Sequence, residues 1–222
     1  MADAGAPTGT DLPWQHMTAS AGLVLAAPVA ALDMDPGVLE ADLQAVEAAV
    51  PVADRSHVPH MPGWACIPMV TTDSRGRVVE NPAFARMPAV RARLADLGLT
   101  VTGSFVIRHA AGWTLDWHYD PVAPHRGTAR LILPLRTTPG SATWIGHERH
   151  AWPVGRCWAG DFTVPHKVTV DPAQDRIVLT LDIAMDAAAQ AIIPAILAAD
   201  GQARAALAQD TQNALLLYRQ AA

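Results

Sequence analysis

The sequence predicts a mainly β protein of the α+β class, in which a compact antiparallel barrel of jelly-roll type is flanked by α-helices. Between residues 101 and 185, short apolar runs are separated at close intervals by Gly, Pro and Asp, which is typical of such barrels. Before and after this region, apolar residues recur at steps of three and four, as in amphipathic helices. The 222 residues, half of them apolar, suit one domain with a substantial core.

These patterns divide the chain into four segments. Residues 1–20 lack periodicity and are expected to form a mobile leader. Residues 21–100 are expected to form strands and helices packed on the barrel, residues 101–185 the barrel itself, and residues 186–222 Ala-rich helices. The last helices could pack on the barrel, cover its mouth or pair two chains. We expect them to pack on the barrel, with homodimer formation through the apolar cluster Leu215–Leu217 as the second choice.

Prolines and glycines set the limits of the expected elements. Pro36 suits the first turn of a helix, Pro51 ends that helix, and Gly98 ends the next one. The elements expected before the barrel are a strand at Gly22–Val29, a helix from Asp35 to Val50, a strand at Trp64–Thr71, its partner at Val78–Val79, and a helix at Phe84–Leu97. The expected barrel strands are Val101–His109, Thr114–His118, Ala129–Leu135, Ala142–Ile145, His150–Val154, Arg156–Ala159, Phe162–Val164, Val168–Val170 and Arg176–Ile183.

Charge and cysteine content exclude several classes of partner and location. The formal net charge is −5 and Lys167 is the only lysine, so a basic surface for nucleic acid or an anionic membrane is not expected. Two cysteines, Cys66 and Cys157, are too few for a disulfide framework. The apolar run Ala21–Leu32 has no positive residue before it and is too short to span a bilayer, so we expect neither a signal peptide nor a membrane segment, and a cytoplasmic location.

A histidine and a carboxylate stand two positions apart on one expected strand. Side chains at His118 and Asp120 then share a face, and His166 follows 48 positions later. Two imidazoles and one carboxylate on one face of an octahedral ion leave three positions open, as in non-haem Fe(II) oxygenases. The same ligands also suit Zn(II), and the dyad alone would favour a surface turn before Pro121.

Two arginines are candidates for binding an anion near this group. Arg176 begins an alternating apolar strand, where an inward-facing guanidinium needs an anionic partner. That partner would be either an anionic cosubstrate or simply Asp175 or Asp182. Arg130 opens another apolar strand and is a second candidate carboxylate clamp.

The region from Gly103 to Ile183 resembles the aspartyl/asparaginyl β-hydroxylase-type family of 2-oxoglutarate- and Fe(II)-dependent dioxygenases, which includes bacterial proline cis-4-hydroxylases. The matching elements are Ile107-Arg108, the turn Ala110-Ala111-Gly112, His118 with Asp120, Arg130 with Pro134-Leu135, Gly155-Arg156-Cys157-Trp158 ahead of Asp161, Pro165-His166, and Asp175-Arg176. Their order and spacing are more specific than the three metal ligands alone. In two places the chain departs from the pattern, since Ile132 replaces a histidine found in many members and no Asn follows His166 closely.

The resemblance implies a double-stranded β-helix of the cupin-like, jelly-roll kind. It implies Fe(II) held by His118, Asp120 and His166, with 2-oxoglutarate held by Arg176 and Arg130, and O2 as the second cosubstrate. The expected reaction is hydroxylation of an unactivated C–H bond in an amino acid that is free, peptidyl or carrier-bound, with desaturation or ring formation left open. No catalytic residue is expected beyond the metal ligands.

Substrate contacts are expected at the mouth of the barrel. Arg126, in the loop after the His-Asp pair, and Arg108 or Arg136 are candidates for binding a substrate carboxylate, and Trp158 for lining the pocket. Trp117 and Tyr119 flank His118 and are expected to face away from the metal.

Other histidines do not form a convincing site. His147 and His150 lie on an expected hairpin turn, where residues three apart do not share a face, and His57 and His60 lie in an expected loop. A non-catalytic cupin-like protein that binds a small ligand is the alternative of a different class. A zinc hydrolase is less well supported, because no general base with an oxyanion stabiliser is found.

Overall fold

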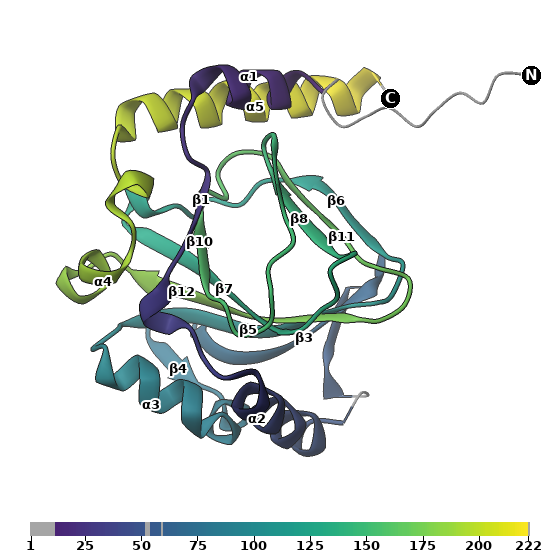
Figure 1. Ribbon diagram of the computed structural model, residues 1–222, viewed down its shortest axis with the longest axis vertical. Coiled ribbons are helices and arrows are strands. Elements are labelled where there is room, and N and C mark those ends of the chain that lie inside the picture. Colours follow the sequence, from purple (N-terminus) through teal and green to yellow (C-terminus); the bar gives the residue numbers. More distant parts are fainter. Residues whose placement is uncertain (1–11, 52–53, 59, 222) are drawn as a thin grey trace, which may run out of the picture.

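Two antiparallel β-sheets face one another and enclose the interior of the barrel (Figure 1). The computed structural model describes residues 12–51, 54–58 and 60–221. The larger sheet has the order β1-β10-β7-β12-β5-β3-β2, with β4 paired to β3, and the smaller sheet has the order β6-β11-β8-β9. Strands of the larger sheet are β1 (Ala26–Pro28), β2 (Ser56–Val58), β3 (Met61–Thr72), β4 (Val78–Glu80), β5 (Val101–His109), β7 (Thr128–Arg136), β10 (Trp158–Gly160) and β12 (Arg176–Ala184). Those of the smaller sheet are β6 (Thr114–His118), β8 (Ala142–Ile145), β9 (Glu148–His150) and β11 (His166–Thr169).

Strand β12 lies in the middle of the larger sheet, between β5 and β7. Its alternating pattern places Ile177, Leu179 and Leu181 in the core beneath the sheet. Val178 and Thr180 point the opposite way and line the interior of the barrel. Both faces of this strand are therefore covered, which explains why it is apolar almost throughout.

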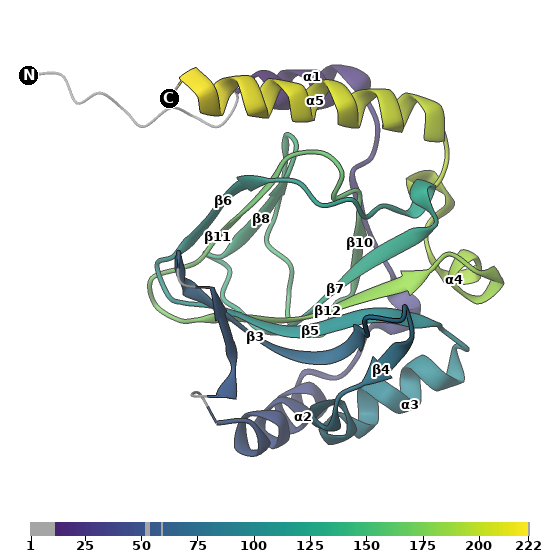
Figure 2. The same cartoon turned by 180° about the vertical axis from the view of Figure 1, so that it is seen from behind.

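Helices α2 (Pro36–Ala49) and α3 (Pro88–Asp96) cover the outer face of the larger sheet (Figure 2). The Asp35 side chain caps α2 by accepting hydrogen bonds from two backbone N–H groups of its first turn. The prediction of α2 is confirmed. The helix predicted at Phe84–Leu97 is divided into a 3-10 turn, η3 (Pro82–Arg86), and α3, because Pro88 cannot continue the preceding turn.

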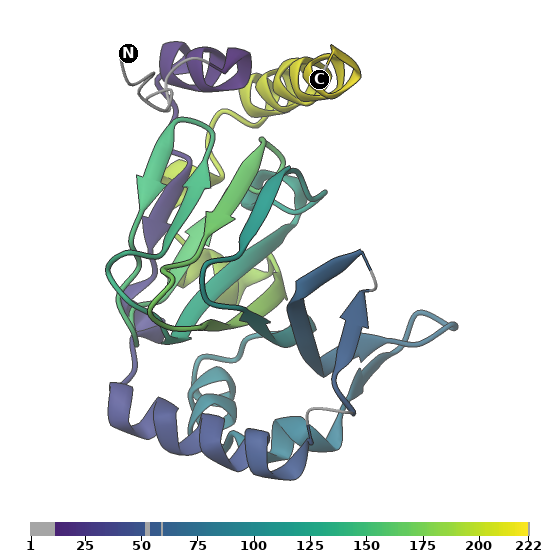
Figure 3. The same cartoon turned by 90° about the vertical axis from the view of Figure 1, so that its right-hand side faces the viewer.

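A second helical layer crosses the opposite end of the molecule (Figure 3). It consists of α1 (Pro13–Ala21) and the long α5 (Gly201–Ala221), which pack side by side. The leader predicted for residues 1–20 is wrong over α1, where Trp14 is fully buried and its ring contacts Trp117 and Tyr218 at centroid distances of 5.4 Å. The first part of that predicted leader lies outside the described residues.

The remaining helical segments are short. They are η1 (Ala30–Leu32), η4 (Pro124–Arg126), α4 (Ala187–Ile192) and η5 (Ala195–Leu197), of which only α4 and η5 lie between the barrel and α5. Packing of the C-terminal helices on the barrel is confirmed by Arg204, a buried α5 residue that lies 3.4 Å from the carboxylate of Asp161. Among the described residues, no helix is both long and apolar enough to cross a membrane.

Several predicted limits in the barrel are wrong. The larger sheet includes β1 to β4, so the boundary predicted at residue 100 does not separate the barrel from an outer layer. The strand predicted at His150–Val154 is limited to β9, and Gly155 then turns the chain with a positive φ of 78°. Phe162–Val164 is a turn, because the Asp161 carboxylate accepts hydrogen bonds from the backbone and hydroxyl of Thr163.

Candidate active site

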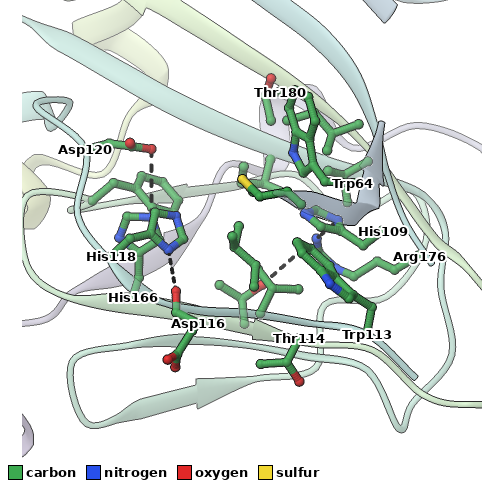
Figure 4. A pocket seen from close by; sticks show the side chains of 18 of the residues that line it. Trp64, His109, Trp113, Thr114, Asp116, His118, Asp120, His166, Arg176 and Thr180 are labelled. Carbon is green, nitrogen blue, oxygen red and sulfur yellow. Dashed lines mark hydrogen bonds and ion pairs between the residues drawn. The ribbon is translucent and has the colours of Figure 1, made fainter. Parts of the chain in front are cut away.

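A cavity of about 670 Å³ opens between the two sheets (Figure 4). Its walls are largely aromatic and include Trp64, Trp113, Trp152 and Phe162. Three candidate metal ligands lie on one side, and Arg176 lies on the other with His109 and Trp113. The cavity therefore combines apolar walls with a few polar groups, as small-molecule sites usually do.

Strand pairing brings the two predicted histidine ligands together. His118 ends β6 and His166 begins β11, where they are directly opposite in the antiparallel register with ring centroids 4.1 Å apart. Asp120 follows β6, and its backbone N–H donates to the Phe162 carbonyl at 2.9 Å. The Asp120 Oδ2 atom lies 3.8 Å from His166 Nε2, and one ligand atom from each of the three residues lies within 4.8 Å of the others.

The backbone fixes which nitrogen of each histidine can bind a metal. Nδ1 of His118 lies 2.7 Å from the Asp116 carbonyl, and Nδ1 of His166 lies 3.2 Å from the Val164 carbonyl. Since a carbonyl only accepts, Nδ1 carries the proton in each ring and Nε2 is left with its lone pair. Burial, followed by the charge of His118, lowers the pKa of His166 to about 3, so this ligand is neutral at physiological pH.

Arg130 holds the carboxylate ligand in place. It lies opposite Asp182 in the pairing of β7 with β12 and donates two hydrogen bonds to that carboxylate, at 2.7 and 2.8 Å. A third hydrogen bond from Arg130 reaches Asp120. Burial alone would lower the pKa of Arg130, but these two carboxylates raise it. This pairing contradicts the prediction that Arg130 clamps the cosubstrate, because its guanidinium is already neutralised by Asp182 and Asp120.

Arg176 is a buried cation without a carboxylate partner among the described residues. Its side chain crosses the barrel from β12 to β8, where Nη2 donates to Thr143 Oγ1 at 3.0 Å, and Nη1 lies 3.4 Å from His109 Nδ1. Asp175 pairs instead with Arg108 and Asp182 with Arg130, so neither acidic residue considered above is the partner of Arg176. Arg176 is 5% exposed, and burial lowers its pKa to about 10. The geometry fits a small carboxylate ligand beside this guanidinium.

His109 is suited to this position because it is neutral. Burial, and then the charge of Arg176, lowers the pKa of His109 well below 6.5. Its imidazole also stacks on Trp113 with the two planes 19° apart. His109 therefore supports Arg176 without adding a second positive charge to the cavity.

The predicted substrate contacts lie outside the cavity. Arg108 points to the opposite face of β5 and pairs with Asp175 at 2.6 Å, while Arg136 contacts Glu40 of α2 at 2.7 Å. Arg126 is exposed on η4 and does not line the cavity. These placements contradict the candidate roles of Arg108 and Arg126, because neither guanidinium faces the metal ligands.

The tryptophans divide between cavity wall and core. Trp158 stacks on Trp152 with ring centroids 5.7 Å apart, and Trp152, not Trp158, lines the cavity. The prediction that Trp158 lines the pocket is therefore corrected to Trp152. Trp117 packs against Trp14 with Tyr119 beside them, on the side of β6 away from the cavity, as predicted for the neighbours of His118.

A comparison with models of protein families shows which family this chain belongs to. The model for aspartyl/asparaginyl β-hydroxylase matches residues 39–185. The chain belongs to this family. It is a 2-oxoglutarate-dependent Fe(II) dioxygenase of the hydroxylase type, and its cofactor and cosubstrates are Fe(II), 2-oxoglutarate and O2. No match was found among curated protein sequences.

One solved structure supports the fold of this hydroxylase, and two others show a weaker similarity. An oxidoreductase of the 2OG-Fe(II) oxygenase family from Burkholderia pseudomallei is 13% identical, with a TM-score of 0.55 over 79% of this chain and 92% of that chain. This likeness confirms the predicted double-stranded β-helix. HygX from Streptomyces hygroscopicus, with nickel and 2-oxoglutarate bound, is 12% identical, with a TM-score of 0.49 over 72% of this chain and 82% of that chain. A prolyl-4-hydroxylase from Pseudomonas putida is 15% identical, with a TM-score of 0.47 over 78% of this chain and 99% of that chain.

Some residues of the hydroxylase site were missed by sequence reasoning. His109 could have been found, because it is two positions from the cavity residue Ile107 on the same strand. The contact of Thr143 with Arg176 and the pairing of Asp182 with Arg130 could not be predicted, because they depend on which strands face or adjoin each other. Arg219 of α5 also lines the cavity, and no motif in the sequence connects this helix to the barrel.

Proposed function

We propose that this hydroxylase inserts a hydroxyl group into an unactivated C–H bond of an amino acid or amino-acid residue. His118, Asp120 and His166 hold Fe(II), and Arg176 binds the distal carboxylate of 2-oxoglutarate. The buried Arg176 guanidinium, across the cavity from three metal ligands and without a carboxylate partner among the described residues, is the observation that carries this proposal. The name of the matching family supports an amino-acid substrate.

When bound, the metal and its two cosubstrates supply the oxidation that replaces hydrogen with hydroxyl. The protein's own residues provide position and exclude water. Asp120 is held by Arg130, and both histidines present Nε2, so the three donors approach an ion from one side and leave its other side to the cavity. The aromatic walls limit the entry of water around the reacting carbon.

The cavity also bears on how 2-oxoglutarate is oriented. Arg176 fixes the distal end on the side of the cavity opposite the ligands, and Thr143 keeps the guanidinium in that position. Ile132, which stands where many family members have histidine, lines the cavity as an apolar residue.

The test is an anaerobic titration of metal-free protein with Fe(II) and then 2-oxoglutarate, in which the weak visible charge-transfer band of a chelated keto acid is recorded. The band should appear in the wild type, fail in His118→Ala, and require far more 2-oxoglutarate in Arg176→Met. An amino-acid panel scored by succinate release would then identify the substrate. If the wild-type protein gives no band and binds Zn(II) tightly or binds no metal, the proposal is wrong, and the barrel is better explained as a non-catalytic binding protein.

Other expectations stay predictions. A homodimer through the C-terminal helices is consistent with Leu217 and Tyr218 of α5, which are 66% and 47% exposed. Sedimentation of the purified chain would test it. The cytoplasmic location and the choice among free, peptidyl and carrier-bound substrates are likewise predictions from the sequence.

A further inference from the structure

Three arginines line the cavity, and they differ in their partners. Arg130 is neutralised by Asp120 and Asp182, as described above. Arg176 and Arg219 have no carboxylate partner among the described residues. Arg176 is assigned to the cosubstrate in the proposed function. Arg219, which comes from α5, is therefore a second cation in the same cavity with no anion yet assigned to it.

The position of Arg219 is fixed by the packing of α5. Leu215, one turn earlier on the same face of the helix, is 1% exposed and packs with Trp14 and Trp117. Two turns earlier, the Gln212 side chain donates to the Thr163 carbonyl at 2.6 Å. The helix lies across the end of the barrel (Figure 1), and Arg219, an exposed residue in its last turn, lines the edge of the cavity.

One hydrogen bond holds the guanidinium beside the metal ligands. Nη2 of Arg219 donates to the carbonyl of Trp117, the residue immediately before His118. A guanidinium has five N–H donors, so most of those of Arg219 are left for another acceptor. The planar arrangement of these donors matches a carboxylate.

Two other charges, Asp116 and Lys167, lie near this edge of the cavity and are close to each other. Asp116 is the nearest acidic residue along β6, and its carboxylate accepts from its neighbouring backbone N–H and lies 3.9 Å from Lys167 Nζ. Lys167 also lies over the Trp117 ring, 6.0 Å from its centroid. Neither residue neutralises Arg219, which leaves a net attraction for an anion at the edge of the cavity.

We propose that Arg219 binds the free α-carboxylate of the substrate, so that the enzyme acts on free amino acids. This inference rests on the proposed function and narrows it. A residue within a peptide, or one held as a thioester on a carrier, has no α-carboxylate and cannot use this contact. The aromatic residues that line the cavity suit an uncharged substrate side chain.

The experiment compares twenty L-amino acids with their primary amides, scored by succinate release. Wild type should respond to free acids, and Arg219→Ala should lower kcat/KM for the best acid by about tenfold to a hundredfold, mainly through KM, because one charge-assisted contact is lost. Arg219→Lys should recover part of this loss, and the amide of the same amino acid should be affected little. Arg126→Ala, at an exposed arginine outside the cavity, is the matched control.

Two readouts separate this inference from the proposed function. The Fe(II)–2-oxoglutarate band in the wild type tests the oxygenase site, and the same band in Arg219→Ala shows that the variant is folded. If the band forms but Arg219→Ala uses the acid as well as wild type does, the inference is wrong. It is equally wrong if the wild type prefers the amide, or if no free amino acid stimulates succinate release. Without a band in the wild type, the failure belongs to the proposed function.

Discussion

Replacing Arg176 with methionine should stabilise the metal-free protein and, at the same time, weaken its binding of 2-oxoglutarate. Burial lowers the pKa of Arg176 from its ordinary value to about 10. At about 1.4 kcal/mol for each tenfold change in the acid constant, the buried charge costs the folded state about 3 kcal/mol. That cost is fully present at every pH well below the folded pKa and disappears only once the pH exceeds the ordinary pKa of the unfolded arginine, so it acts fully at pH 7.

Methionine has a similar length and an apolar side chain, so it should remove this cost while filling the space. For a chain of this size, about 3 kcal/mol corresponds to a rise in Tm of up to roughly 10 °C. The loss of a buried ion pair with the distal carboxylate should weaken 2-oxoglutarate by about 2–5 kcal/mol, which is about thirtyfold to several thousandfold in Kd.

Thermal unfolding of both proteins, metal-free and with Fe(II) and 2-oxoglutarate under anaerobic conditions, measures both effects. The wild type should gain stability from the cosubstrate, and Arg176→Met should gain almost none. Arg108→Met is the matched control, because this arginine is paired with Asp175 on the outer face and its loss should lower Tm slightly. An Arg176→Met protein that is less stable than wild type and still binds 2-oxoglutarate tightly would show that the guanidinium is structural.

Three further changes test the surroundings of the site. Asp182→Asn should loosen the arginine that holds Asp120 and weaken Fe(II) by about tenfold to a hundredfold in anaerobic titration; unchanged affinity would contradict this role. The metal-free wild type should lose stability as the pH falls below about 6.5, because His109 takes up a proton in the unfolded chain but not in the folded one. His109→Gln should remove this contribution, which amounts to up to about 1.4 kcal/mol per pH unit in denaturant titrations. Gly63→Ala should destabilise the fold by about 1–3 kcal/mol, since its Cβ would lie 2.2 Å from the ring of Trp113, and a Tm equal to that of wild type would contradict the packing described.

Elements with a strong local pattern were predictable. The strand β12 and the helix α2 were placed within a residue or two, because one alternates apolar residues and the other has both helical spacing and a capping Asp35. The helix α1 was missed, since Trp14 is buried only by residues far away in the sequence, such as Trp117. Local periodicity carries no information on such contacts.

The site residues also divide into those that a local pattern predicts and those that depend on contacts between distant parts of the chain. His118 and His166 could be paired from sequence, because a motif and a spacing pointed to both. The assignment of Arg130 to the cosubstrate failed, since only the register of β7 against β12 reveals that it lies opposite Asp182. Arg219 could not be placed at all, because its approach to the cavity depends on how α5 crosses the barrel.

The formal charges around the cavity floor have a consequence for ligand loading. Apart from Arg219 at the edge of the cavity, which is left for the substrate, two carboxylates, Asp120 and Asp182, are balanced by two guanidinium groups, Arg130 and Arg176, and burial keeps His166 neutral. A divalent ion alone would leave this region with two excess positive charges, and the 2-oxoglutarate dianion alone with two negative ones, but the two together restore neutrality. Because buried charges are weakly screened, each ligand should strengthen the binding of the other, reciprocally. Metal occupancy of this enzyme should therefore follow the supply of 2-oxoglutarate as well as the supply of iron.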